Sequence, residues 1–198
     1  LIKEGKDPIE LNAGSISVNY YESLYSPTVT AVITFVDAGG NIEDDKTGAL
    51  KSIKEALPLE GNEDLSFKIT TKTGELDFTK KENIFKVNRC PVISREANRH
   101  VVMLDLISIQ EKSNDDLPIF DKFKGKISDT VKKLLTEKLE ITQDKVEVDE
   151  TENSYNFTGR GRGVLNIIRE LCKRSIPPNG DAGYFFYQTK SAFKYKAI

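Results

Sequence analysis

Residues 153–198 read NSYNFTGRGRGVLNIIRELCKRSIPPNGDAGYFFYQTKSAFKYKAI, and this stretch decides the fold of the second half of the chain. Its apolar residues recur every three or four positions, the period of one helix face, at Val164, Ile167, Ile168, Leu171 and Cys172. Lys173 and Arg174 suit the negative end of a helix dipole, and Pro177 prevents a further turn. The pattern predicts an amphipathic helix over residues 164–174.

Two aromatic runs follow this helix, at residues 183–188 and 191–196. In the second run, Phe193 and Tyr195 alternate with lysines, which is the period of a strand with one buried face. Because only Thr189 and Lys190 separate the runs, we expect a tight hairpin that packs back on the helix.

The first half of the chain has the two-residue period of strands instead. Residues 15–21 place Ile16, Val18 and Tyr20 on one face, and residues 28–37 form a strand dense in β-branched side chains. A Ser-Pro break separates them at residues 23–27. A short helix is expected at residues 48–57, which have apolar residues at helical spacing at Leu50, Ile53 and Leu57.

Further strands are predicted at residues 65–70, 75–79, 84–93 and 100–109. Pro91 would remove a donor from the ladder, so its strand is expected to lie at an edge or to be bulged there. Six or seven strands with one short helix indicate a small β-barrel or sandwich.

Residues 111–117, EKSNDDL, are charged and turn-rich, and they are the best candidate for a domain boundary. Beyond them, Ser128 is expected to cap a helix that extends to Leu139, and residues 145–149 alternate as a short strand. The predicted fold class is therefore α+β, with an N-terminal small β-barrel in residues 1–112 and a small α/β domain in residues 113–198.

Three stretches resemble the central baseplate hub proteins of contractile-tailed, T-even-like bacteriophages, which are related to the hub and spike proteins of type VI secretion systems. The first is the helix with its basic end, followed by GYFFY at residues 183–187. The second is YYESLYSPTVTAVITFVDA at residues 20–38, and the third begins with ISDTVKKLL at residues 127–135. The resemblance covers nearly the whole chain in the order of its elements.

The resemblance implies a structural protein whose first domain is a tail-tube-like barrel. Three copies would form a ring that joins the tail tube to the spike and lets DNA pass, in a virion baseplate assembled in the host bacterial cytoplasm. The implied partners are further copies of the chain, the tail tube protein, the spike protein and baseplate wedge proteins. Hubs of this kind usually carry a second barrel, which this sequence lacks, so a shortened chain and a different assembly both stay open.

Assembly is expected to use two parts of the chain. Residues 28–36 are too apolar to be left as an open sheet edge in a solitary protein. The hairpin at residues 184–195 offers aromatic side chains with polar tips, a type enriched at interfaces. A barrel core and a hairpin core would explain the same residues.

The composition narrows the function classes. The chain has 29 basic and 31 acidic residues and a net charge of −2, which argues against a dedicated nucleic-acid binder and suits a lumen that does not hold DNA. No apolar run approaches the roughly 18 residues of a membrane-spanning helix, so no membrane partner is expected. Cys90 and Cys172 lie among apolar neighbours, which favours buried free thiols over a disulfide.

Four features could carry chemistry, and each has a simpler explanation. The run GRGRG at residues 159–163 could bind a phosphate before the helix, but it lacks the Lys-Ser/Thr end of a P-loop. A structural glycine loop explains it better, with arginines that could contact an acidic partner. His100 is the only histidine and favours a structural role. Glu147 and Asp149 are expected on one solvated strand face, and the Asp pairs at residues 44–45 and 115–116 are expected to be loop charge.

The sequence therefore predicts no catalytic, cofactor-binding or metal-ligating residue, and it favours a structural protein over an enzyme. Two alternatives remain from other classes. One is a cell-wall hydrolase attached to a spike, which would need a carboxylate pair in a cleft. The other is a monomeric ligand-binding module, which would need a concave aromatic pocket.

Overall fold

The computed structural model describes residues 1–2, 9, 11, 14–38, 42–43, 48, 50–53, 59–72, 74–96, 99–180 and 182–198. Contacts within the chain divide it into two compact units. The first unit comprises Leu1–Tyr21 and Thr30–Ile109, and the second unit comprises Glu22–Val29 and Gln110–Ile198. The predicted division into domains 1–112 and 113–198 stays a prediction, and each unit is described by itself below.

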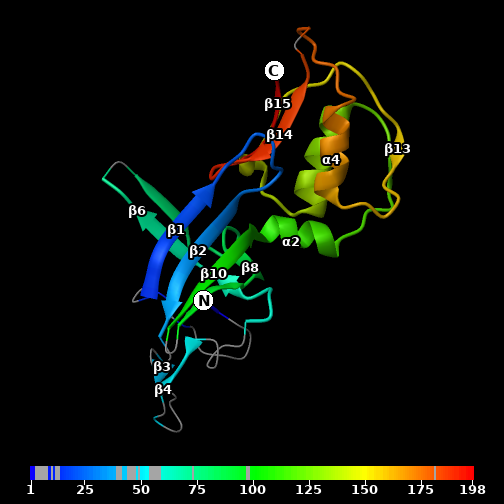
Figure 1. Ribbon diagram of the computed structural model, residues 1–198. Helices are drawn as coiled ribbons and strands as arrows, with labels where there is room; N and C mark the ends of the chain where they lie inside the picture. Colours follow the sequence, from blue (N-terminus) through cyan, green and yellow to red (C-terminus); the bar gives the residue numbers. More distant parts are fainter. Residues whose placement is uncertain are drawn as a thin grey trace. The chain divides into compact units, whose positions relative to one another are not determined.

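The first unit is built on one antiparallel sheet. Its strands follow the order β1 (Ser15–Tyr21), β2 (Thr30–Asp37), β10 (Arg99–Ser108), β8 (Phe85–Arg89) and β5 (Asp64–Leu65), and β9 (Val92–Glu96) also pairs with β10. Figure 1 shows β1, β2 and β10 side by side in this order. Among the described residues no pairing joins β5 back to β1, so the sheet is curled and open, and a closed barrel stays a prediction.

Strict alternation explains why this sheet buries one face. In β2 every second residue is buried, and in β10 the buried residues Val102, Leu104 and Leu106 alternate in the same way. Leu104 pairs with Ile33 in register, so the apolar residues of the two strands share a face. The strands predicted at residues 28–37 and 100–109 are confirmed as β2 and β10, and their alternation shows which face each one buries.

An aromatic cluster covers this face of the first unit. The hairpin of β6 (Phe67–Thr70) and β7 (Glu75–Phe78) supplies Phe67 and Phe78, whose ring centroids are 4.9 Å apart. Phe78 also meets Phe85 of β8 at 5.2 Å and Tyr20 of β1 at 5.0 Å. Such pairs stabilise beyond the area that they bury. The short strands β3 (Ile42–Glu43) and β4 (Leu50–Lys51) form a separate pair.

Three predictions for the first unit need correction. The strand expected at residues 65–70 is divided between β5 and β6, and the strand expected at residues 84–93 is interrupted at Cys90 and Pro91. The interruption fits the irregularity expected at a proline, because the ladder register shifts on both sides of it, at Asn88 and at Ile93. The Pro91 carbonyl accepts a hydrogen bond from the Met103 amide at 3.0 Å. Leu50 lies in a strand instead of the expected helix, Ile53 is helical, and Leu57 lies outside the described residues.

The second unit combines helices with a small mixed sheet. Its helices are α2 (Ile109–Asp116), α3 (Ile127–Lys133), which continues as the π-helical turn η2 (Leu134–Lys138), and α4 (Val164–Cys172), with a 3-10 turn η3 (Gln143–Lys145). Its strands are β12 (Val146–Val148), β14 (Tyr184–Gln188) and β15 (Phe193–Ala197) in the order β12-β15-β14, and the pair β11 (Lys122–Phe123) with β13 (Phe157–Thr158). In Figure 1, α4 lies between the β14–β15 pair and the chain that carries β13.

The core of the second unit lies where α4 packs on the hairpin. Val164, Ile167 and Ile168 are at most 1% exposed, and Tyr195 of β15 is fully buried. Ser175 and Tyr195 share a hydrogen bond between their hydroxyl groups at 2.5 Å, so the phenol is not left unsatisfied in the core. The predicted helix face and its packing against an aromatic hairpin are confirmed.

Several details of the second unit differ from expectation. The charged stretch at residues 111–117 is mostly helix α2, not a turn-rich loop. The next helix starts at Ile127 with Lys126 as its N-cap, so Ser128 is not the cap; its amide instead donates to the Thr151 hydroxyl at 3.0 Å. The hairpin loop has four residues, 189–192, closed by a bond from the Thr189 amide to the Ala192 carbonyl at 2.9 Å.

The Ser-Pro break belongs to the second unit, which the sequence pattern did not reveal. The Lys190 amide donates to a Glu22 carboxylate oxygen at 2.6 Å, and the Val29 amide donates to the Gln188 side chain at 3.1 Å. The Tyr25 ring meets Phe185 edge-on at 5.8 Å. The segment Glu22–Val29 is therefore anchored on the β14–β15 hairpin.

Cys90 and Cys172 form no disulfide, as expected, but both are half-buried instead of buried. Burial raises the pKa of the Cys172 thiol to about 11, so it is protonated at neutral pH.

Within the described part of the chain, no helix is both long and apolar enough to cross a membrane.

Candidate functional site

The glycine loop at residues 159–163 is held by close backbone contacts. A Cβ atom on Gly159 would lie 2.2 Å from the Ile119 carbonyl oxygen, so only glycine fits there. The loop backbone is also fixed by hydrogen bonds from the Gly159 amide to Asp121 at 2.9 Å and from the Gly161 amide to Ile119 at 2.8 Å. These contacts explain the glycines of the loop by the packing of its backbone.

The N-terminus of α4 is already occupied by a side chain of the protein. Asn114 of α2 is 4% exposed, and its side-chain oxygen accepts from the Leu165 amide at 2.8 Å. A Cβ on Gly163 would lie 2.4 Å from the same oxygen. Because Asn114 fills the place that an anion would take, the structure favours a structural loop over a phosphate cradle. Its role as a cap was missed because nothing near Asn114 in sequence indicates it.

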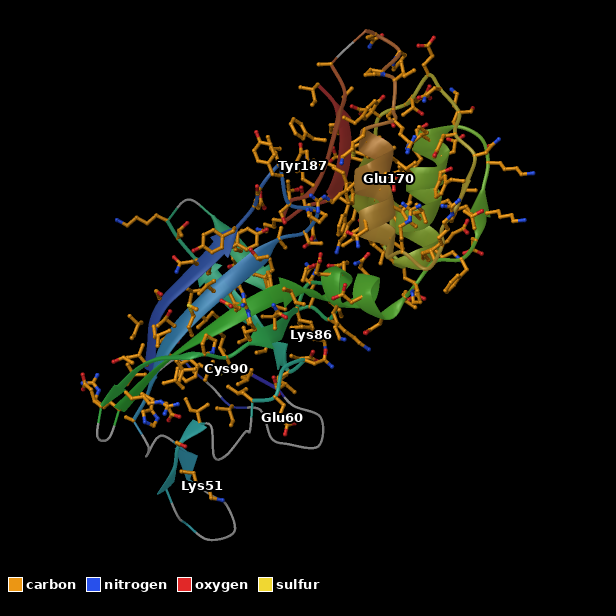
Figure 2. The ribbon with its side chains drawn as sticks, turned by 45° about the vertical axis from the view of Figure 1, so that its right-hand side comes forward. Lys51, Glu60, Lys86, Cys90, Glu170 and Tyr187 are labelled. Carbon is orange, nitrogen blue, oxygen red and sulfur yellow. The ribbon has the colours of Figure 1, made fainter. Side chains whose placement is uncertain are left out.

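A groove of about 380 Å³ lies beside this loop, and three arginines line it. Arg160 and Arg162 reach it from the loop, Arg174 from the end of α4, and Glu170 from the α4 surface, where Figure 2 labels it. Glu170 forms ion pairs with Arg162 and, at 3.3 Å, with Arg174. One carboxylate is therefore shared by two guanidinium groups, and Arg160 adds a third positive charge.

Aromatic rings form part of the groove wall. The Arg174 guanidinium carbon lies 4.8 Å from the centre of the Tyr155 ring, a cation–π contact. Tyr155 stacks on Phe157 with centroids 5.7 Å apart, and Phe157 stacks on Phe123 at 5.1 Å. The Tyr155 ring therefore restricts the Arg174 side chain. A planar guanidinium that already lies on a ring loses little further freedom when it binds a partner.

The ion pairs decide the charge of Glu170. Partial desolvation alone would raise the pKa of its carboxyl group, but the hydrogen bonds and charges of Arg174 and Arg162 outweigh that effect and lower the pKa below its ordinary value. Glu170 is thus held ionised at neutral pH, and the four charged side chains of the groove leave it with an excess of positive charge.

The carboxylates of the predicted acidic strand are neutralised by neighbouring lysines. β12 runs parallel to β15, so Glu147 pairs with Lys194 in register. Glu147 lies 3.3 Å from Lys194 and 3.4 Å from Lys196, and Asp149 lies 3.0 Å from Lys196. Desolvation raises the pKa of Glu147, but the two lysines outweigh it and lower the pKa overall. A general acid needs a raised pKa, so Glu147 does not suit the role of the acid in the glycosidase hypothesis.

These lowered pKa values predict how stability depends on pH. Glu147 and Glu170 bind protons less readily in the folded chain than in the unfolded one, so their contribution is present above the ordinary value of 4.5 and is lost as pH falls through the lower folded values. We expect the urea midpoint of the second unit to change little between pH 7 and pH 5 and to fall below that. The fall should be smaller in Glu147→Gln than in the natural sequence, and an equal fall in both would contradict the assignment to Glu147.

The other candidate residues show no site. His100 is exposed on β10, and Asp115 and Asp116 are exposed on α2; Asp44 and Asp45 lie outside the described residues. Among the residues that the structure describes, no group of three or more His, Cys, Asp or Glu side chains could hold a metal ion. The hairpin aromatics Tyr184, Phe186, Phe193 and Tyr195 are at most 6% exposed, so they form a core and do not line an open pocket.

The strand β1 exposes several apolar side chains of the first unit. It lies at the end of the strand order, and among the described residues its outer side has no pairing strand. Ile16, Val18 and Tyr21 are 59%, 37% and 51% exposed. A groove of about 440 Å³ runs beside this strand and is lined by Val18, Ile33, Leu65 and Phe67, among others.

Comparisons with known proteins give a broad likeness to solved structures. No family model matches the chain, and no curated protein matches it. One solved structure that is similar is a component of the E. coli type VI secretion system that exhibits structural similarity to the T4 bacteriophage tail proteins gp27 and gp5. It aligns with 87% of this chain at 11% identity and a TM-score of 0.46, and the chain spans 39% of that protein's length. The likeness is one of fold in broad outline.

Proposed function

We propose that this protein is a structural component of a phage tail or type VI secretion assembly, of the hub type. The observation that carries the proposal is the apolar edge at β1, whose outer side has no pairing strand in the part of the chain that the structure describes. This strand has seven residues and contains neither charge nor proline, and its one irregularity is a register shift between Ser15 and Ser17. Charges, prolines and bulges are the features that usually protect such an edge in proteins that stay single. An edge of this kind is suited to pairing or packing with a neighbouring subunit.

The position of this edge differs from the sequence-based expectation. Residues 28–36 were expected to face a neighbour or to close a barrel, but β2 is an interior strand between β1 and β10. Tyr184, Phe186, Phe193 and Tyr195 of the hairpin are likewise buried within their own unit, and Phe185 and Tyr187 are partly exposed. The proposed subunit contact is therefore assigned to β1, with its exposed residues Ile16, Val18 and Tyr21.

In this proposal three copies form a ring that joins a tail tube to a spike. The tail tube protein, the spike protein and the baseplate wedge proteins are its partners, and DNA passes without being bound. The net charge of −2 supports this last point, because a basic lumen would bind phosphates through counterion release. The site of action is then the tail baseplate of a virion, assembled in the host bacterial cytoplasm.

A charge on β1 tests the proposed contact. Ile16 is 59% exposed, so Ile16→Lys should leave the fold intact and weaken self-association by about tenfold or more, because an edge lysine opposes strand pairing. The matched control is Leu117→Lys, which adds the same charge at an apolar residue that is 45% exposed in a loop. Sedimentation across a concentration series compares the three proteins. Equal association constants for all three would contradict a role for β1.

The proposal also states that the protein is not an enzyme. We expect no hydrolysis of peptidoglycan or of nucleotides by the purified chain above the level of a blank preparation. The matched test variants are Glu147→Gln and Arg162→Gln. They remove the carboxylate and the arginine that hydrolysis by this chain would need most. Hydrolysis that either single substitution abolishes would contradict this part of the proposal.

A further inference from the structure

The arginine groove of the second unit has more positive charge than it can neutralise internally. Arg162 and Arg174 share the single carboxylate of Glu170. Arg160 is exposed, and within the described residues it has no hydrogen-bond or ion-pair partner. Its backbone lies in the left-handed region, with a φ of 56°, and the residue lines the groove together with Arg162.

Apolar surface adjoins these charges. Phe120 is 69% exposed, and its ring lies 3.2 Å from the position that a Cβ atom would take on Gly161, between the two loop arginines. Tyr155 and Phe157 line the groove itself. Exposed aromatic residues next to arginines are typical of protein-binding surfaces, where both residue types are enriched.

We propose that this groove docks an acidic segment of a partner protein. A carboxylate of that segment pairs with Arg160, whose planar fork can bind it through two parallel hydrogen bonds. A second carboxylate competes with Glu170 for Arg162 and Arg174. Glu170 thus acts as an internal occupant that keeps the two arginines ordered and weakens the binding of outside anions. This inference goes beyond the proposed function, because the groove would work in a monomer as well as in a ring.

The charge pattern favours an acidic protein over a nucleic acid. A nucleic-acid surface needs a stripe of cations long enough to follow several phosphates. Here Asp121 flanks the loop and is itself paired with Lys138 at 2.8 Å, and Glu170 lies inside the groove. The whole chain has a net charge of −2. A compact positive site in an acidic protein suits one or two carboxylates.

Fluorescence anisotropy with a labelled hexaglutamate peptide tests the inference directly. We expect saturable binding at about 20 mM salt that weakens at about 150 mM, because exposed charges are screened over about 8 Å at that ionic strength. A hexaglutamine peptide should not bind. A labelled hexathymidylate of similar charge should bind at least about threefold more weakly than hexaglutamate, a difference on the scale of one exposed ion pair.

Three single substitutions assign the binding to the groove. Arg160→Asn removes the unpaired cation and keeps a residue that tolerates a left-handed backbone, so binding should weaken about threefold or more. Glu170→Gln frees Arg162 and Arg174, so binding should strengthen about threefold. Arg169→Gln changes the net charge as Arg160→Asn does, but Arg169 is exposed on α4 outside the groove, so binding should be unchanged. Thermal melts confirm that each variant is folded.

The possible results either support or overturn the proposed docking site. Opposite shifts in Arg160→Asn and Glu170→Gln, with Arg169→Gln unchanged, support the acidic docking site. Equal weakening in Arg160→Asn and Arg169→Gln, absence of hexaglutamate binding at low salt, or tighter binding of hexathymidylate would overturn it. Each of these results is independent of whether the chain forms a ring.

Discussion

Ile168→Asp is expected to lower the free energy of unfolding by roughly 3 kcal/mol or more, because it would bury a charge that has no partner. Ile168 is fully buried on α4, and the cluster around it consists of apolar residues from α3, η2, α4 and the β14–β15 hairpin. None of these side chains carries a positive charge that could pair with a carboxylate. Urea unfolding monitored by circular dichroism would measure the loss.

The neighbouring residue provides the control for this prediction. Arg169 is exposed on the same helix, so Arg169→Asp should change the free energy of unfolding by no more than about 0.5 kcal/mol. If the two substitutions prove equally mild, the buried face of α4 is assigned wrongly. If they prove equally severe, α4 is covered on both sides in the natural protein.

Gly159→Ala is the second substitution with a large expected effect, roughly 3 kcal/mol, because an added methyl group would force the backbone to move. The new Cβ would lie 2.2 Å from the Ile119 carbonyl oxygen and 2.7 Å from its carbon, and neither is the flexible end of a side chain. The shift would also break the hydrogen bonds of Gly159 and Gly161 that hold the loop beside the groove. In Gly159→Ala, the unfolding midpoint and the affinity for hexaglutamate should both fall.

Gly74 is the matched control, since nothing lies within 4 Å of the position its Cβ would take. Gly74→Ala should change stability by no more than about 0.5 kcal/mol. A mild effect of Gly159→Ala, similar to that at Gly74, would show that the glycine loop is not as tightly packed against Ile119 as described.

The elements that the sequence predicted well are those whose period is set by one buried face. β10 was placed within one residue of its bounds, because alternation of apolar and polar side chains decides which face is buried. β1 is the exception, since its alternation placed it at residues 15–21 although none of its residues is buried. The buried face of α4 followed from its period of 3.6 in the same way. Each of these signals is local, so no knowledge of distant contacts was needed.

The elements that the sequence missed depend on contacts with distant residues. α2 has little apolar periodicity, but its Asn114 is buried against the start of α4. Ser128 has the residue type of an N-cap, yet the helix starts one residue before it, and the Thr151 hydroxyl accepts its amide. The parallel pairing of β12 with β15 brings Glu147 beside Lys194, 47 positions away in the sequence.

Only part of the candidate site could be predicted from the sequence, because the site combines residues that lie apart in the chain. The run GRGRG indicated a glycine loop with two arginines. Nothing in that run indicated that Glu170 and Arg174 would complete a charge cluster, or that Tyr155 would lie under Arg174. The spacing of Glu170 and Arg174 by four residues on a helix was the one local signal that could have been used.

The central claim is assembly through the open edge of the first unit, and the mass of the native particle tests it most directly. Native mass spectrometry of the full-length protein at micromolar concentration, alone and with a spike protein, gives that mass. We predict a particle of three chains that gains mass when the spike protein is added. A strict monomer under both conditions would contradict the account and leave a likeness of fold without a shared role.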